Sequence, residues 1–316
     1  MGSVVISIDA ELGWGFHDLD RLPRHRVENA RWGWESTHTI LDRYEVPATW
    51  AIVGHLLLSE CDGRHDDHPT PPDWFERERN GWADRDDLRF APELVERLVD
   101  SPVDHEIASH SFSHVLFGAP DTSAEIAREE CRRAKAVAAE WGLSLDSFVF
   151  PRNEVGHLEV LAETGFSVYR GRTSLPEGAS SVLATLARNE SLLVEPRIDS
   201  HGLVDVPASV FCFGFEGTLR RAAERLWNDP MVELARRGID QAAESDGLFH
   251  LWLHPNNLTT PADADRLERI VEHVDRRRST SDLQVETMRQ VGDRARSADT
   301  PVVPDATEAS ASVTQL

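Results

Sequence analysis

Two histidines stand four residues apart in the stretch "DHEIASHSFSH", which runs from Asp104 to His114. His110 and His114 follow a short apolar run, and imidazoles at this spacing can converge on one metal ion where the backbone turns or coils between them. Ser, Phe and Ser separate the pair, so it lacks the glutamate that serves as general base in the H-E-x-x-H helix of zinc proteases. A metal site built on this pair therefore needs a base from elsewhere in the chain.

The first apolar segment, "VVISIDAE", supplies two carboxylates. Asp9 and Glu11 lie two positions apart, so they point to the same side of an extended chain. One carboxylate can ligate a cation while the other accepts a proton. Two imidazoles and one carboxylate leave a coordination position for water, which is the pattern of a catalytic zinc site. We expect a divalent metal ion here, with Zn²⁺ as the first candidate, although several divalent ions accept these ligands.

Short apolar or β-branched runs alternate with helical patterns along the chain, and this order predicts a parallel sheet. For 316 residues the expected fold class is α/β, in the form of a closed or nearly closed (β/α) barrel. Strands are expected at 4–9, 47–55, 105–110, 145–153, 166–171, 192–197, 202–209 and 247–255, with one more near 283–287, and helical patterns at 28–45, 91–100, 121–142, 157–165, 217–245 and 262–277.

The carboxyl ends of parallel barrel strands meet at one rim, where active sites form. By this rule Arg152, after the fourth strand, and His254, after the late strand, join the two carboxylates and the two histidines. The convergence of carboxylates, imidazoles and a guanidinium from four strands is stronger evidence for a site than any one motif.

One domain with a tail is the expected organisation. Residues 1–295 are assigned to a single catalytic barrel domain, interrupted near 61–88 by a polar, Pro- and Asp-rich inserted loop. The cluster "HDDH" inside this loop is interpreted as a solvated turn. Residues 296–316 are polar and small, which predicts a disordered tail.

Four blocks in the right order resemble the polysaccharide deacetylase family, also called NodB-homology or carbohydrate esterase family four. They are "SIDAELGWG", "HEIASHSFSH", "FVFPRN" and "LFHLWLHPNN", and they span roughly Val4 to Pro255. The resemblance implies a distorted, seven-stranded (β/α) barrel with a divalent metal, commonly zinc. It also implies removal of N- or O-acetyl groups from sugars, and some relatives hydrolyse other C–N bonds.

Site roles follow from the resemblance by position. Asp9 resembles the general base, His254 the general acid that protonates the departing amine, and Arg152 the arginine that holds and tunes the base. The metal ligands would be Glu11, His110 and His114. The chain departs from the family in having Asp-Ala-Glu for adjacent aspartates and Pro-Arg-Asn for R-x-P, which indicates a divergent branch.

The expected reaction is metal-dependent hydrolysis of an acyl C–N bond in a sugar or glycan precursor. The metal would bind the acyl oxygen and a water, Asp9 would remove a proton from the attacking water, and His254 would protonate the leaving nitrogen. Substrate-binding candidates are Trp14 and Trp252, which can stack on a sugar face, and Asn153 and Asn256, which can bond hydroxyl groups. His250 is expected inside the barrel, and His17 and His55 are interpreted as loop histidines.

Charge and cysteine content limit the partners. The net charge of −22 excludes nucleic-acid phosphate as a partner, and with Lys135 as the only lysine it indicates adaptation to high salt. Cys61, Cys131 and Cys212 form neither a disulfide framework nor a C-x-x-C metal pair, which favours a reducing, cytoplasmic setting. The sequence also predicts no signal peptide and no membrane insertion.

Two alternatives stay open. A barrel glycosidase would use paired carboxylates but would leave the histidine pair unexplained. A non-catalytic carbohydrate-binding protein on a decayed deacetylase fold would have lost one of the catalytic positions. The sequence names neither the sugar nor the oligomeric state.

Overall fold

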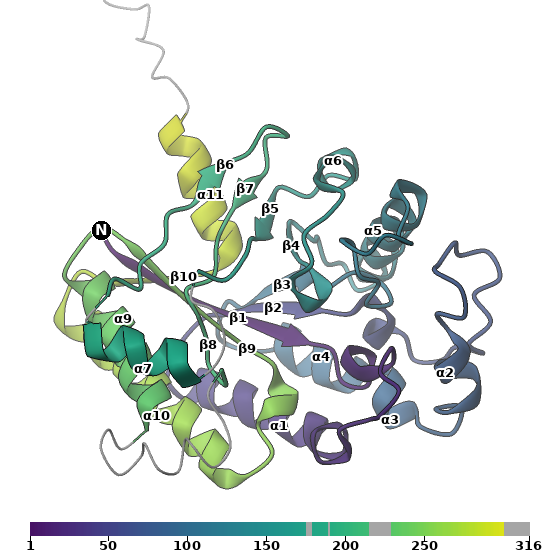
Figure 1. Cartoon of the computed structure of the whole chain (residues 1–316), viewed down its shortest axis with the longest axis horizontal. Helices are drawn as coiled ribbons and strands as arrows, with labels where there is room; N and C mark the ends of the chain where they lie inside the picture. The colour runs from purple at the N-terminus through teal and green to yellow at the C-terminus, as the bar shows by residue number, and fades with distance from the viewer. Residues whose placement is uncertain (175–178, 189, 215–228, 300–316) are drawn as a thin grey trace, which may run out of the picture.

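A curled, mixed α/β half barrel is the centre of the computed structural model, which describes residues 1–174, 179–188, 190–214 and 229–299. Ten strands form one sheet in the order β6-β7-β5-β4-β3-β2-β1-β9-β8, and β10 pairs with β1 off this path (Figure 1). The expected fold class is confirmed. The strands are β1 Ser3–Ala10, β2 Thr49–Ile52, β3 Glu106–Ser109, β4 Ser147–Val149, β5 Val168–Arg170, β6 Arg197–Ile198, β7 Val204–Asp205, β8 Val210–Phe211, β9 Leu248–Leu253 and β10 Gln284–Glu286.

Pairing is parallel throughout this sheet, with the exception of the antiparallel β6–β7 pair. Parallel pairing places the carboxyl ends of β1, β2, β3, β4, β5 and β9 at one rim. Four 3₁₀ turns follow strand ends at or near this rim: η1 Trp14–Phe16, η2 Gly54–Leu57, η3 Pro151–Asn153 and η4 Pro255–Asn257. The rim is therefore built from short, tightly turned segments.

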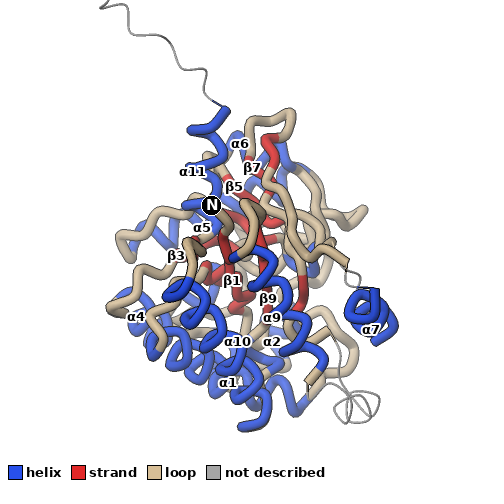
Figure 2. Tube along the Cα trace, turned by 90° about the vertical axis from the view of Figure 1, so that its left-hand side faces the viewer, coloured by secondary structure: helices blue, strands red, loops and turns tan. Residues whose placement is uncertain are grey.

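Helices cover the outer face of the sheet, and Figure 2 shows them flanking the central strands. None of the helices in the described ranges is long and apolar enough to cross a bilayer. The helices are α1 Arg24–Arg43, α2 Glu76–Asn80, α3 Asp86–Arg89, α4 Pro92–Val99, α5 Ala124–Glu140, α6 Leu158–Glu163, α7 Ala179–Arg188, α9 Pro230–Ala243, α10 Pro261–Thr280 and α11 Met288–Asp299.

The two-residue period of β1 decides which of its side chains reach the barrel interior. Val4, Ile6 and Ile8 belong to the large core under the helices. Val5 belongs to a second, smaller core, made of small residues from several strands and of Met288 and Val291 from α11. Because Asp9 has the same parity as Val5, it points into the barrel, at the rim end.

Two expectations about chain organisation need correction. The insert near 61–88 is not a solvated loop: it contains α2 and α3, and His68 and Glu78 are buried in it, because they pair with other buried groups. The expected tail begins too early, since α11 continues to Asp299; residues 300–316 lie outside the described residues. The helical pattern at 217–245 is described only from residue 229, and there α9 confirms it.

Candidate active site

Side chains from the ends of four strands meet at the rim. Asp9 is the next-to-last residue of β1 and Glu11 follows the strand, His110 follows β3, Arg170 ends β5, and His254 follows β9. Glu11 and His254 line a cavity of about 280 Å³. The cavity is lined by Glu11, Gly15, Phe16, Arg26, His114, Arg152, Asn153, Phe211, Trp252, His254, Asn256 and Asn257.

The three expected metal ligands converge. Oε2 of Glu11 lies 3.1 Å from Nε2 of His114 and 3.5 Å from Nε2 of His110. His110 donates from Nδ1 to the carbonyl oxygen of Val149 at 2.9 Å, so in a neutral ring Nε2 carries the lone pair. That nitrogen is buried, has no hydrogen-bond partner and faces a carboxylate oxygen. Two electron pairs directed at each other fit a cation between them, and so the donor set suits a divalent metal.

The loop that carries both histidines is held in an uncommon backbone conformation. Ser111 has φ 61° and His114 has φ 65°, a left-handed region that non-glycine residues rarely adopt. Buried Glu130 holds this loop: its Oε2 accepts the backbone N–H groups of Phe112 and Ser113 at 2.9 and 2.8 Å. Its Oε1 accepts the hydroxyl of Ser113 at 2.6 Å. Sequence reasoning missed Glu130, which lies on the inner face of α5.

Asp9 is bound by a different arginine from the one expected. Both of its oxygens accept from Arg170, at 2.6 and 2.7 Å. Arg152 instead donates to Asp18, at 2.6 Å, and to the carbonyl oxygen of Gly15. The assignment of Arg152 to Asp9 is therefore corrected, since the turn η3 directs Arg152 along the outer rim while Arg170 points into the barrel.

Charge keeps Asp9 ionised inside the barrel. Burial raises the pKa of Asp9, but the positive charge and hydrogen bonds of Arg170 outweigh burial, and the pKa is lowered from its ordinary value. Arg170 is itself buried and lies with its guanidinium 4.4 Å from the ring centroid of Trp252. The result is a fixed carboxylate that can accept a proton near neutral pH.

His254 is more exposed than the carboxylates and the other two histidines of the site, with 24 % of its side chain exposed. Nδ1 donates to Oδ1 of Asn257 at 3.2 Å, which directs Nε2 to the carboxylates. Nε2 lies 3.6 Å from Oδ2 of Asp9 and 3.8 Å from Oε1 of Glu11. A proton on Nε2 would therefore be held between two anions and within reach of the cavity.

Glu11 and His114 are in the protonation states that bind cations. Burial raises the pKa of Glu11, but His254, His110 and His114 lower it well below its ordinary value. Burial lowers the pKa of His114, which favours the neutral ring. Asn256 donates from Nδ2 to Oε1 of Glu11 at 3.0 Å, so Oε2 is the oxygen that faces the histidines.

The expected substrate-binding residues divide into two groups. Trp252, Asn153 and Asn256 line the cavity. Trp14 does not: its ring is fully buried, and Nε1 donates to the carbonyl oxygen of Arg89 at 3.2 Å. The expectation that Trp14 stacks on a sugar is wrong, because η1 turns this side chain inward beneath the rim.

The remaining histidines of the sequence expectations are also placed. His250 is inside the barrel as expected, with Nε2 2.8 Å from the hydroxyl of Ser7. His55 and His17 are not exposed loop residues; both are buried. A signal for Arg170 was present in the sequence, because in "SVYRG" it has the inward parity of Val168 and ends a strand.

Comparison with known proteins gives the chain's relatives. The polysaccharide deacetylase family matches residues 29–167. A protein assigned as a polysaccharide deacetylase from Mycobacterium smegmatis has the same fold, with 19% identity, TM-score 0.62 and coverage of 94% of this chain and 90% of that one. Another from Pseudomonas aeruginosa PAO1 has 15% identity and a TM-score of 0.61, and the match covers 95% of this chain and 92% of that one. The Puue allantoinase has 14% identity and a TM-score of 0.61, and the match covers 95% of this chain and 91% of that one. No curated protein matches the chain significantly.

Proposed function

We propose that this chain, a member of the polysaccharide deacetylase family, is a metal-dependent hydrolase that removes an N-acetyl or related acyl group from a sugar or glycan precursor. The observation that carries the proposal is the partnerless Nε2 of His110, directed at Glu11 beside the Asp9–Arg170 pair. Glu11, His114 and His254 line one cavity, and Asp9 lies 3.6 Å from Nε2 of His254.

Glu11, His110 and His114 are the residues that would hold the metal. When bound there, a divalent ion would supply Lewis acidity for an acyl oxygen and lower the pKa of a water. Asn256 orients Glu11, and Val149 fixes the tautomer of His110, so the ligand atoms are set before any ion enters.

Two further side chains transfer protons. Asp9 accepts the proton of the attacking water, since Arg170 keeps it ionised and immobile. His254 gives a proton from Nε2 to the leaving nitrogen, because Nδ1 is fixed by Asn257 and the ring borders the cavity. Asp9 and His254 are close enough to exchange the proton between turnovers through one water.

The cavity favours a small substrate over a long polymer. About 280 Å³ accommodates one sugar ring better than several. Trp252 and Phe211 provide apolar surface, and Asn153 provides an amide for hydroxyl groups. Asn153 also accepts from Arg170 at 2.8 Å, so its Nδ2 is the part free to donate.

A cyclic amide or ureide is the second candidate substrate. The same small polar cavity suits such a ring, and the allantoinase with this fold is named for that kind of substrate. A glycosidase role for the paired carboxylates is disfavoured, since it gives no function to His110 and His114, whose Nε2 atoms face Oε2 of Glu11.

The test is acyl release by protein loaded with metal in high salt. Wild type should release acetate from N-acetylated monosaccharides, and Asp9→Asn should lose the reaction while retaining the bound metal. Ammonia or ring opening from cyclic amides without acetate release would select the second candidate. Inactivity of a fully metal-loaded wild type on both panels would favour the non-catalytic alternative.

A further inference from the structure

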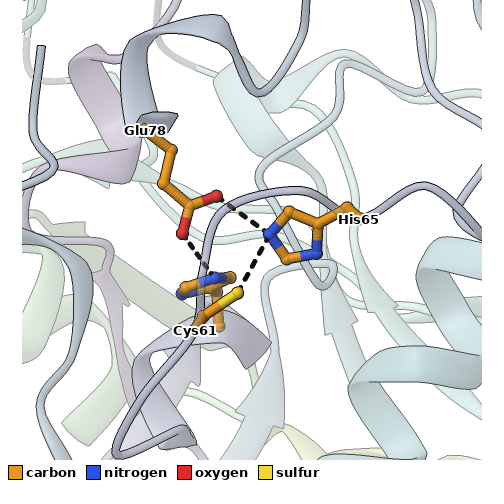
Figure 3. Close-up of side chains that lie close together, drawn as sticks. Cys61, His65 and Glu78 are labelled. Atoms are coloured by element: carbon orange, nitrogen blue, oxygen red, sulfur yellow. Dashed lines mark hydrogen bonds and ion pairs between the residues drawn. The ribbon is translucent and has the colours of Figure 1, made fainter. Parts of the chain in front are cut away.

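A second group of ligand-type side chains lies in the insert, away from the cavity. Cys61, His65 and Glu78 point toward one another in Figure 3, and His55 of η2 completes the group. Each of the four offers one ligand atom, and these atoms all lie within 4.8 Å of one another. The side chains of His55, His65 and Glu78 are no more than 5% exposed. We call these four residues the insert cluster.

The insert cluster has too few protons for its contacts when its rings are neutral. His55 donates from Nδ1 to the carbonyl oxygen of Arg89 at 3.2 Å, so Nε2 carries a lone pair. That lone pair faces Oε1 of Glu78 at 3.0 Å. Nε2 of His65 faces both Sγ of Cys61, at 3.4 Å, and Oε2 of Glu78, at 2.9 Å, and one N–H cannot serve both equally.

This geometry is not that of a cysteine–histidine–carboxylate triad. In a triad the two ring nitrogens divide the work, one facing the nucleophile and the other facing the acid. Here the same nitrogen of His65 faces both Cys61 and Glu78. Donor atoms that all face one point are instead the arrangement of a metal site.

A third group of similar composition provides an internal comparison. His38, Asp42 and His105 also bring ligand atoms within 4.8 Å. There Nδ1 of His105 accepts the N–H of Ala48 at 3.2 Å, so Nε2 carries the proton and donates it to Asp42 at 3.1 Å. Ordinary hydrogen bonds account for a neutral His105, whereas His55 and His65 each need an added proton or a shared cation to make their contacts.

Outer contacts hold the insert cluster in place. Arg89 donates to Oε1 of Glu78 at 2.9 Å and to the carbonyl oxygen of Cys61 at 2.7 Å. The N–H of Gly63 donates to Sγ of Cys61 at 3.3 Å, a contact that stabilises a thiolate. His65 has φ 43°, a left-handed conformation that the turn imposes while its ring points inward. Such supporting bonds are typical of metal ligands.

From this geometry we propose a second divalent-metal site, of the structural zinc class, whose four ligands are His55, Cys61, His65 and Glu78. Two imidazoles, a thiolate and a carboxylate complete a tetrahedral shell and neutralise the ion's charge. Four protein ligands leave no position for a reacting water, so the ion would fasten the insert to η2 rather than take part in hydrolysis. The proposal does not depend on the reaction proposed above.

Cobalt substitution of the full-length protein tests the site without any mutation. Apoprotein titrated with Co²⁺ in high salt should bind two equivalents, and one should give the near-ultraviolet band of a cobalt–thiolate bond. The rim ligands include no sulfur, so the band reports the insert cluster alone. A wild type that binds cobalt without this band would overturn the proposal.

Two variants assign the band. Cys61→Ala should lose the band and one equivalent of metal, whereas Cys131→Ala, which removes a buried core thiol, should retain both. His65→Gln should weaken the binding of the cobalt equivalent that gives the thiolate band and should leave the rim equivalent bound. Persistence of the band in Cys61→Ala would contradict the assignment of the ligands. If Cys61→Ala fails to fold, the wild type provides the test: added zinc should protect Cys61 from alkylation, and unprotected alkylation would contradict the assignment of the ligands.

Discussion

The rim site and the insert cluster are built from similar residues but differ in number and access. At the rim, Glu11 and His114 line a cavity with His110 next to Glu11, and the side chain of His254 is 24 % exposed. In the insert, a thiol is added to two histidines and a glutamate, and His55 and Glu78 are almost completely buried. In a metal site, three protein ligands beside a cavity leave a position for a reacting molecule, whereas four protein ligands leave none. The comparison teaches that ligand count and enclosure, more than residue type, distinguish the two roles.

The two regions are also in physical contact. The ring of Trp14 lies 4.4 Å from that of His55 on one side and 5.4 Å from that of His17 on the other. The ring of His17 is 6.1 Å from that of His114. Packed rings therefore connect the insert cluster to the rim, so a change in one region can displace the other.

The largest expected effect comes from His114→Ala. We expect it to remove the rim metal and to lower kcat/KM by at least about 1,000-fold, since a metal contributes several kcal/mol to such a reaction. Metal analysis should fall from two equivalents to one, and the cobalt–thiolate band should remain. Loss of both equivalents would show that the two sites do not bind independently and would break the comparison.

Arg170→Gln is expected to have the next largest effect. Removing one partner of a buried ion pair costs about 3–5 kcal/mol, because Asp9 is left buried without its counter-charge. Activity should fall as well, and denaturant unfolding measures the stability. The matched control is Arg152→Gln, whose pair with Asp18 is partly exposed and contributes about 1 kcal/mol or less. An equal loss of unfolding free energy in the two variants would contradict the assignment of Arg170 to Asp9.

The sequence was sufficient to predict the barrel and to predict that Asp9, Glu11, His110, His114 and His254 meet at one rim, because this follows from periodicity, strand ends and a known motif. It was not sufficient for Arg170, since a lone arginine in a strand has no local signal except its parity. It was misleading for Trp14, which a short turn buries.

The insert cluster could not have been found from sequence. Its ligands are separated by proline-rich, acidic segments that have the composition of a solvated loop. Only tertiary packing brings η2, Cys61, His65 and α2 together. The hydrogen bonds that orient the rings of His55 and His65 also join residues far apart in the chain, so the composition of the insert does not predict them.

Chelation should separate the two sites in time. A soluble chelator should remove the rim metal first, with loss of hydrolysis, because that site opens to the cavity. Release from the insert should be slower and should lower the thermal midpoint by several degrees, since the ion would be lost together with the fold of the insert. Stopped-flow release read by a zinc dye, beside a melting curve, gives both steps. Simultaneous release would mean that the two sites are equally accessible.

His68→Ala should have the smallest effect, and it tests how the insert supports the rim. Nε2 of His68 lies 2.9 Å from Oε1 of Glu130, whose other bonds hold the loop between His110 and His114. Removal of this buried contact should cost about 1–2 kcal/mol, while Ser113 still bonds Glu130 and keeps the loop near its position.

We expect kcat to fall by roughly threefold to tenfold with KM unchanged, because a small displacement of His114 affects the reaction more than substrate binding. His68→Gln, whose amide N–H can approach Oε1 of Glu130, should restore most of the loss. If both variants retain wild-type kcat while losing stability, then Glu130 positions the histidine loop without help from the insert. The insert would in that case contribute to folding alone.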